Sequence, residues 1–189
     1  WGMAALHPER VAGVVAACTP YIPFPSVAVH TDVVEGDIER QYVAWFQIPD
    51  VPETVMNPNA EMIVDKMMRS SVPMEEAYAA AFADGKLNMN PFLNIESYTA
   101  TGEMLLTEEH FHHYVQAFSE TGFRGGINWY RNIDQNAAAH PQVGVAPLDM
   151  PCLMLLAELD PALRPRFAED MPERCSDLEM HIIDNAAHW

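Results

Sequence analysis

The stretch CLMLLAELD at residues 152–160 decides the fold, because it places an aspartate just beyond a fully apolar run. Residues 152–157 have the length of a strand and no polar alternation, which indicates a strand buried in a parallel sheet. A short helix is predicted at 164–171 and a second strand at 179–183. Strand, helix and strand form a βαβ unit, so we expect the two strands to be parallel neighbours.

Asp160 and His188 lie just past the carboxyl ends of these two strands. In open α/β sheets, that edge is where ligands bind. An aspartate there can orient a histidine ring and stabilise its protonated form. Taken singly, Asp160 is readily explained as a helix cap and His188 as one of eight histidines. Their joint placement favours a catalytic acid–base pair.

A third apolar run of strand length, VAGVVAAC, occupies residues 11–18 and is also predicted to be buried on both faces. Residues 1–7 read as a helix without a capping residue before it, and the chain ends just beyond a strand. No serine or cysteine has the G-x-S-x-G spacing of a nucleophile elbow. We therefore expect a piece of a larger domain, with its nucleophile before Trp1, and we do not expect these 189 residues to catalyse alone.

The middle of the chain, residues 26–145, is predicted to be an inserted helical lid between core segments 1–25 and 146–189. Amphipathic helices with proline-marked breaks are predicted at 34–47, 59–70, 73–84 and 107–119. The glycines of GFRGGINWYRN, residues 122–132, suit a turn before a helix that starts at Ile127 and continues past Asp134. The helices form either a plain core or a lid that lines a pocket.

Composition limits the partners and the chemistry. Lys plus Arg number 10 against 27 Asp plus Glu, and the net charge of −17 argues against nucleic acid or an anionic membrane as partner. No run is long and apolar enough to span a bilayer. Cys18 and Cys152 lie in apolar runs and are interpreted as small buried hydrophobes.

The three cysteines match no metal motif, and His110 and His113 lack a third ligand, so no metal is expected. With no N-glycosylation sequon either, a cytoplasmic location is expected.

Four segments, in order, resemble the epoxide hydrolases of the α/β-hydrolase fold, close to the soluble type. They are WGMAALHPERVAGVVAACTPYIP at 1–23, QYVAWFQIPDV at 41–51, GFRGGINWYRN at 122–132, and LLAELD at 155–160 paired with IIDNAAHW at 182–189. The resemblance covers nearly the full chain. It implies an α/β-hydrolase fold with part of a parallel sheet, a helical lid, and no cofactor.

The resemblance also implies a role for each matching residue. Family members use an aspartate nucleophile that opens the epoxide and forms an ester. Tyr42 and Tyr130 would hold the epoxide oxygen, and His188, oriented by Asp160, would activate the water that hydrolyses the ester. The implied substrates are a small apolar epoxide and water, and a homodimer is the assembly considered. The residues expected to line the substrate pocket are Pro20, Trp45, Phe46, Trp129 and Trp189.

Two departures and two alternatives accompany this resemblance. The family commonly has asparagine where this chain has Cys18, and glycine where it has Ala187. A haloalkane or haloacid dehalogenase, or a serine carbon–carbon hydrolase, shares the acid–base pair, but halide binding favours tryptophan, histidine or amide donors over paired tyrosines. A non-catalytic relative that acts as a binding protein would be expected to lose one of the four candidate catalytic residues, and this chain keeps them all.

Overall fold

The computed structural model describes residues 1–23, 25–70, 72–82 and 85–189. Contacts divide the chain into two compact units. The first unit joins Trp1–Phe24 to Gln135–Trp189, and the second is Pro25–Asp134. The sequence set the corresponding limits of the lid at residues 26 and 145. Within the described residues, no helix is both long and apolar enough to cross a membrane.

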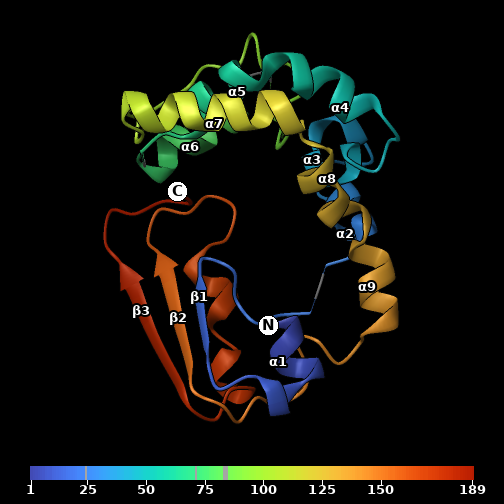
Figure 1. Cartoon of the computed structure of the whole chain (residues 1–189), viewed down its shortest axis with the longest axis vertical. Coiled ribbons are helices and arrows are strands. Elements are labelled where there is room, and N and C mark those ends of the chain that lie inside the picture. The colour runs from blue at the N-terminus through green and yellow to red at the C-terminus, as the bar shows by residue number, and fades with distance from the viewer. Residues whose placement is uncertain (24, 71, 83–84) are drawn as a thin grey trace. The chain divides into compact units, whose positions relative to one another are not determined.

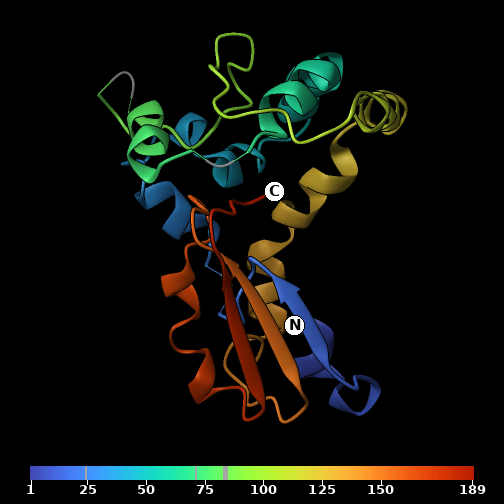
Figure 2. The same cartoon turned by 90° about the vertical axis from the view of Figure 1, so that its left-hand side faces the viewer.

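The first unit contains a three-stranded parallel sheet in the order β1-β2-β3, and the strands lie side by side (Figures 1 and 2). The strands are β1 (Val14–Ala17), β2 (Cys152–Ala157) and β3 (Leu178–Ile183). Cys152 pairs with Val14 on one side and with Leu178 on the other. The predicted parallel pairing of β2 with β3 is confirmed, and all three carboxyl ends meet at one edge.

The prediction that residues 11–18 are buried on both faces is wrong. In β1, half-buried and exposed positions alternate, and 72% of Val15 is exposed. The core lies against the other face, where Met154 and Leu156 of β2 pack in one cluster with Ala4 of α1 (Gly2–Leu6). A continuous apolar run predicts a strand, but which faces are covered depends on segments distant in sequence.

The connection from β2 to β3 differs from the predicted helix at 164–171. It forms two short 3-10 helices, η4 (Pro165–Ala168) and η5 (Met171–Glu173). Each of these helices has a proline in its first turn, Pro165 in η4 and Pro172 in η5, a position that suits the start of a short helix better than the interior of a continuous one. A further 3-10 helix, η1 (Pro8–Arg10), follows α1.

The second unit is helical. Its helices are α2 (Val27–Asp32), α3 (Tyr42–Trp45), α4 (Val51–Met56), α5 (Ala60–Met67), α6 (Met74–Ala81), α7 (Glu108–Thr121) and α8 (Arg124–Arg131), with the 3-10 helices η2 (Ile38–Arg40) and η3 (Asn57–Asn59). Helix α9 (Ile133–Ala139) leads from this unit into the first. The core of the second unit includes Trp45, Ile63, Ile95 and Ile127.

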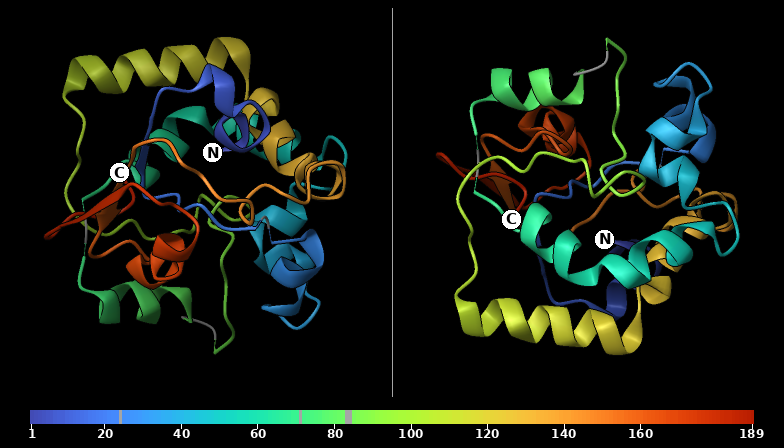
Figure 3. Two further views of the ribbon diagram at one scale, coloured as in Figure 1. Left: turned by 90° about the horizontal axis from the view of Figure 1, so that it is seen from below. Right: turned by 90° about the horizontal axis from the view of Figure 1, so that it is seen from above.

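Helix α7 is a straight rod of 14 residues, seen from below and from above in Figure 3. Its start was predicted from Thr107, whose hydroxyl accepts a hydrogen bond from the His110 amide at 3.2 Å. The predicted cap is therefore confirmed. The prediction for 73–84 gives α6, which ends at Ala81, while the predicted end at Asp84 lies outside the described residues.

Two predicted long helices are broken. The segment 34–47 forms η2 and the short α3, because Gly36 has a φ of 84° and the Gln41 side chain caps α3. The helix predicted from Ile127 begins earlier, at Arg124, so the prediction of a turn at Gly125 and Gly126 is wrong, and the helix ends at Arg131. Asn132 follows with φ −96° and ψ 0°, and its side chain donates to the Asn128 carbonyl at 2.7 Å. Such local bonding by asparagine competes with helix continuation.

Candidate active site

Asp160 lies beyond the carboxyl end of β2 and is fully buried. One carboxylate oxygen, Oδ1, accepts hydrogen bonds from the backbone amides of Ala162 and Leu163, both at 2.8 Å. The turn after β2 therefore fixes the carboxylate, because the two amides belong to residues two and three positions after Asp160. The other oxygen, Oδ2, faces His188.

His188 completes the pair from the loop after β3. Its Nδ1 lies 2.9 Å from Oδ2 of Asp160, and its side chain is half-buried. The hydrogen bond to Asp160 raises the pKa of His188, burial acts against this, and the carboxylate charge adds to it. Burial alone would raise the pKa of Asp160, but hydrogen bonds from His188 and the two amides outweigh it and lower that pKa. Both shifts favour a charged imidazolium–carboxylate pair.

The geometry of the pair suits proton transfer. When Asp160 accepts from Nδ1, the neutral ring of His188 has its lone pair on Nε2, which can take a proton from water. This tautomer is assigned from the hydrogen bond. The structure thus brings together the two side chains that the βαβ unit places at one edge of the sheet.

Cys18 is a third polar side chain at this edge. It directly follows β1, and its backbone φ of 59° lies in the left-handed region. Its sulfur and the ligand atoms of Asp160 and His188 all lie within 4.8 Å of one another. Burial raises the pKa of the Cys18 thiol, and the charge of Asp160 and a hydrogen bond to it raise it further.

The interpretation of Cys18 as a small buried hydrophobe is therefore wrong, because its side chain is half-buried beside a carboxylate. The same interpretation is confirmed for Cys152, which is 4% exposed. The sequence did contain a signal for Cys18. It is the position at which this chain departs from the asparagine that the resembled family commonly carries.

Two tyrosines lie side by side in the second unit. The ring centroids of Tyr42 and Tyr130 are 5.4 Å apart, and the rings are nearly perpendicular at 81°. Tyr42 opens α3, where the Gln41 side chain accepts a hydrogen bond from the Val43 amide at 2.8 Å. Ile127 of α8 is buried in the core of this unit and shares a helix face with Tyr130, three residues later. The structure thus brings the two predicted phenols together.

An ion pair fixes the end of α8 beside Tyr130. Nη1 and Nη2 of Arg131 donate to the two carboxylate oxygens of Glu53 at 2.5 and 3.0 Å. Nε of Arg131 donates to the carbonyl of Phe46 at 2.8 Å. The hydrogen bond from Arg131 lowers the pKa of Glu53. Because Phe46 directly follows α3, this network ties α3 to α8 and holds Tyr42 close to Tyr130.

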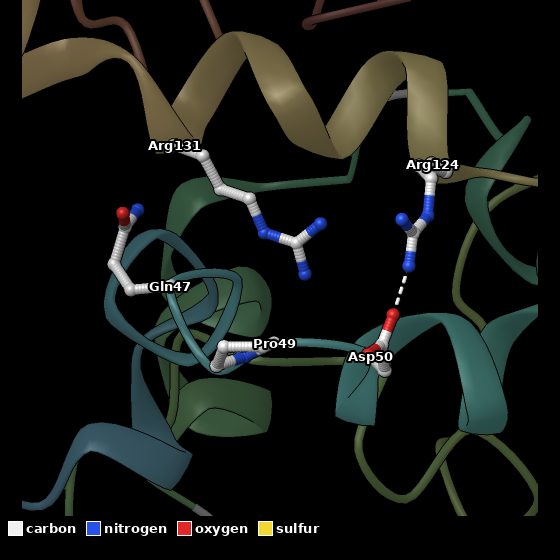
Figure 4. Close-up of a pocket in the computed structure, with 5 residues that line it drawn as sticks. All are labelled: Gln47, Pro49, Asp50, Arg124 and Arg131. Atoms are coloured by element: carbon white, nitrogen blue, oxygen red, sulfur yellow. Dashed lines mark hydrogen bonds and ion pairs between the residues drawn. The ribbon is translucent and has the colours of Figure 1, made fainter.

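A polar hollow of about 340 Å³ lies next to this ion pair (Figure 4). Its lining residues are Gln47, Pro49, Asp50, Arg124 and Arg131. Arg124 pairs with Asp50, and Arg131 pairs with Glu53, so both cations have carboxylate partners. The hollow therefore offers no excess charge for an anion, and its lining is not the mainly apolar one that an apolar substrate needs.

The residues predicted to line the substrate pocket differ in their surroundings. Trp45 and Phe46 are 1% and 4% exposed and belong to the core of the second unit. The Phe46 ring contacts both tyrosines, with centroid distances of 5.5 and 5.2 Å. In the first unit, Pro20 is buried, and the exposed Trp189 ring lies 5.1 Å from the ring of His188. Trp129 is 79% exposed.

Comparison with known families now adds to this geometry. The model of the alpha/beta hydrolase fold matches residues 1–189. The chain belongs to the alpha/beta hydrolase fold family. The predicted fold class is therefore confirmed. For this alpha/beta hydrolase, the edge that holds Asp160 and His188 is the one at which ligands bind in open α/β sheets.

The relatives of this alpha/beta hydrolase include epoxide hydrolases. Bifunctional epoxide hydrolase 2 of Rattus norvegicus is 30% identical over 195 residues, which cover 100% of this chain and 33% of the rat protein. Epoxide hydrolase A of Mycobacterium tuberculosis is 28% identical over 196 residues, covering 100% of this chain and 59% of that protein. The chain thus spans between a third and about three fifths of these relatives.

Epoxide hydrolases are also among the solved structures that resemble this chain. Epoxide hydrolase A from Mycobacterium thermoresistibile has a TM-score of 0.80 and 28% identity, and the match covers 100% of this chain and 59% of that one. Epoxide hydrolase I of Solanum tuberosum has a TM-score of 0.75 at 20% identity, with the same coverage, and is a likeness of fold alone. The predicted resemblance to epoxide hydrolases is confirmed by the matches at 28–30% identity.

Proposed function

We propose that this chain supplies the acid–base pair and the lid tyrosines of an epoxide hydrolase, which adds water to a small apolar epoxide and releases a vicinal diol. The observation that carries the proposal is the contact between the rings of Tyr42 and Tyr130 at 5.4 Å. Two phenols side by side suit an uncharged oxygen that becomes an alkoxide. The names of the relatives support the same reaction.

In the first step, an aspartate carboxylate attacks one epoxide carbon. This nucleophile is implied by the family resemblance and is expected outside residues 1–189. A carbon–oxygen ester bond forms as the ring carbon–oxygen bond breaks. The released oxygen takes a proton from one lid phenol while the other donates a hydrogen bond. A strained ether needs acid assistance at oxygen, and Tyr42 and Tyr130 supply it without placing a charge in an apolar pocket.

In the second step, His188 activates water. Nε2 takes a proton as the water oxygen adds to the ester carbonyl, and the diol then leaves and the aspartate is regenerated. Asp160 stabilises the imidazolium that forms, which the raised pKa of His188 supports. The proton on Nε2 returns to solvent or to the ionised lid phenol, so the cycle closes and needs no cofactor.

The experiment separates the two steps in the full-length protein. With a simple aryl epoxide, His188→Gln is expected to open the ring and then accumulate the ester, seen as a mass increase equal to that of the epoxide. Tyr42→Phe/Tyr130→Phe is expected to slow ester formation by roughly 10²–10⁴-fold. Matched controls are His181→Gln and Tyr114→Phe, which change an exposed histidine and an exposed tyrosine.

Two results would overturn the proposal. One is undiminished ester formation in the double tyrosine variant, and the other is release of halide from a haloalkane without turnover of any epoxide. The coding sequence upstream of Trp1 gives an independent test. An aspartate after a histidine, just before Trp-Gly, supports the epoxide reaction, whereas a serine there points to an esterase or carbon–carbon hydrolase.

Location and assembly are two further parts of the proposal. We propose a cytoplasmic protein, which the three free cysteines support, because thiols stay reduced in that compartment. A homodimer is the assembly proposed with it, and sedimentation of the full-length protein tests it.

A further inference from the structure

We propose that Cys18, Asp160 and His188 form a binding site for a borderline-soft divalent cation, with Zn²⁺ as the ion that fits best. The three residues follow β1, β2 and β3 in turn, so the parallel sheet brings their side chains to one edge. One ligand atom from each lies within 4.8 Å of the other two. Among the described residues, these three form the group of histidine, cysteine and acidic side chains whose ligand atoms lie close enough together to hold a metal ion.

The donor set matches the preferences of zinc. Thiolate sulfur, imidazole nitrogen and carboxylate oxygen are its three common protein ligands, and three ligands leave a fourth position for water. Bond lengths of about 2.0–2.3 Å put tetrahedral ligand atoms roughly 3.3–3.6 Å apart. The longest separation, at most 4.8 Å, needs to close by about 1 Å, whereas Nδ1 of His188 and Oδ2 of Asp160, 2.9 Å apart, need to open slightly. Small side-chain torsions of Cys18 and His188 can supply both changes because neither side chain is fully buried.

The surroundings of the carboxylate favour binding further. Oδ1 of Asp160 is already held by the amides of Ala162 and Leu163, so Oδ2 points at the site in a fixed direction. Orienting contacts of this kind are what metal ligands commonly receive from the residues around them. On binding, the sulfur–zinc bond replaces the sulfur–hydrogen bond of Cys18, and the thiol proton goes to solvent.

A cation at this position would stop the acid–base pair, a consequence that rests on the proposed function. If zinc takes Nδ1 of His188, the hydrogen bond to Asp160 is lost. If zinc takes Nε2, the lone pair that activates water is occupied. The asparagine that the resembled family commonly has in place of Cys18 offers no thiolate, so inhibition at this site would depend on Cys18.

Binding is tested without any activity assay. The full-length protein is titrated with ZnCl₂, and binding is measured by calorimetry. It is also titrated with Co²⁺ and followed by absorption, because a thiolate ligand to Co²⁺ produces a near-ultraviolet charge-transfer band. Because loss of even an orienting contact costs about 10–100-fold in affinity, Cys18→Ser and Cys18→Ala are expected to bind at least about tenfold more weakly and to lose the band. His181→Gln is the matched control, since His181 pairs with Glu179 at 2.5 Å without a thiol.

The outcomes separate the two proposals. One zinc ion per wild-type chain, weakened by both Cys18 variants and unchanged by His181→Gln, supports the site. Equal binding by wild type and the Cys18 variants, or no binding by wild type, overturns it. Zinc binding by a full-length protein that hydrolyses no epoxide would leave the site standing and remove the proposed function. Epoxide hydrolysis that zinc inhibits in wild type and not in Cys18→Ser supports both.

Discussion

Nδ1 of His188 lies 2.9 Å from Oδ2 of Asp160, and the carboxylate in this pair is fully buried whereas the imidazole is half-exposed. The buried partner is therefore fixed and the exposed one is open to water. Asp160 is also held by two backbone amides, so His188 is the group whose protonation can change with least disturbance of the fold.

The first prediction concerns the pKa of His188. It is raised by the hydrogen bond to Asp160 and by its charge. Asp160→Asn removes the charge and leaves the burial, so the pKa of His188 should fall below that of wild type. Titration of the His188 ring by NMR measures this, with the exposed His181 as internal reference. An unchanged midpoint in Asp160→Asn would show that the carboxylate does not control His188.

The second prediction is the pH dependence of stability. Because the pKa of His188 is raised, its contribution to the free energy of unfolding is complete below about pH 6.5. That contribution is lost as the pH rises through the raised pKa. Because the pKa of Asp160 is lowered, its contribution to the free energy of unfolding is complete above about pH 3.9. That contribution is lost as the pH falls through the lowered pKa. The difference in melting temperature between wild type and His188→Gln should be largest between these limits and shrink on both sides. A difference independent of pH would contradict the charged pair.

The position of the acid–base pair was predictable because parallel strands end at the same edge, whatever their neighbours are. For Cys18, the departure from asparagine marked the position, but its place beside Asp160 was not predictable, since a left-handed φ at the last residue of an apolar run decides where its side chain goes. The two short helices η4 and η5 had a local signal in Pro165 and Pro172, which the helical pattern concealed. The exposure of Val15 had no local signal in the sequence, because other segments of the chain decide which face of a sheet is covered.

The third prediction concerns Arg131 and Glu53. Their side chains are 20% and 8% exposed, so removing one partner leaves the other charge poorly solvated. Arg131→Met is expected to cost about 3 kcal/mol in the free energy of unfolding, measured with denaturant. Arg124→Met is the control, because Nε of Arg124 also lies 3.4 Å from Oε1 of Glu53 but its side chain is 59% exposed, so its loss should cost less than about 1 kcal/mol.

The ion pair between Arg131 and Glu53 also leads to a prediction about Tyr42 and Tyr130. If the network through Phe46 holds Tyr42 near Tyr130, Arg131→Met should slow ester formation from an epoxide more than Arg124→Met does. Equal rates for the two variants, at a temperature where both are folded, would show that the ion pair stabilises this unit without positioning the phenols.

The fourth prediction compares two glycines in the left-handed region. Gly144 has φ 83° and Gly85 has φ 77°. A Cβ at Gly144 would overlap the backbone of Ile22 and Pro23, whereas a Cβ at Gly85 would meet no atom of the described residues within 4 Å. Backbone strain costs roughly 1–2 kcal/mol at either position. Overlap with backbone adds about 1–3 kcal/mol at Gly144 alone.

Gly144→Ala is therefore expected to lower the free energy of unfolding by about 3 kcal/mol, and Gly85→Ala by about 1 kcal/mol. Denaturant titrations of both variants measure the difference, and Gly125→Ala serves as the reference. Gly125 has open space in helix α8, so alanine there should stabilise by about 0.5–1 kcal/mol. Equal losses at Gly144 and Gly85 would mean that the chain around Ile22 moves aside, and the close approach of these two segments would then not be a constraint on the fold.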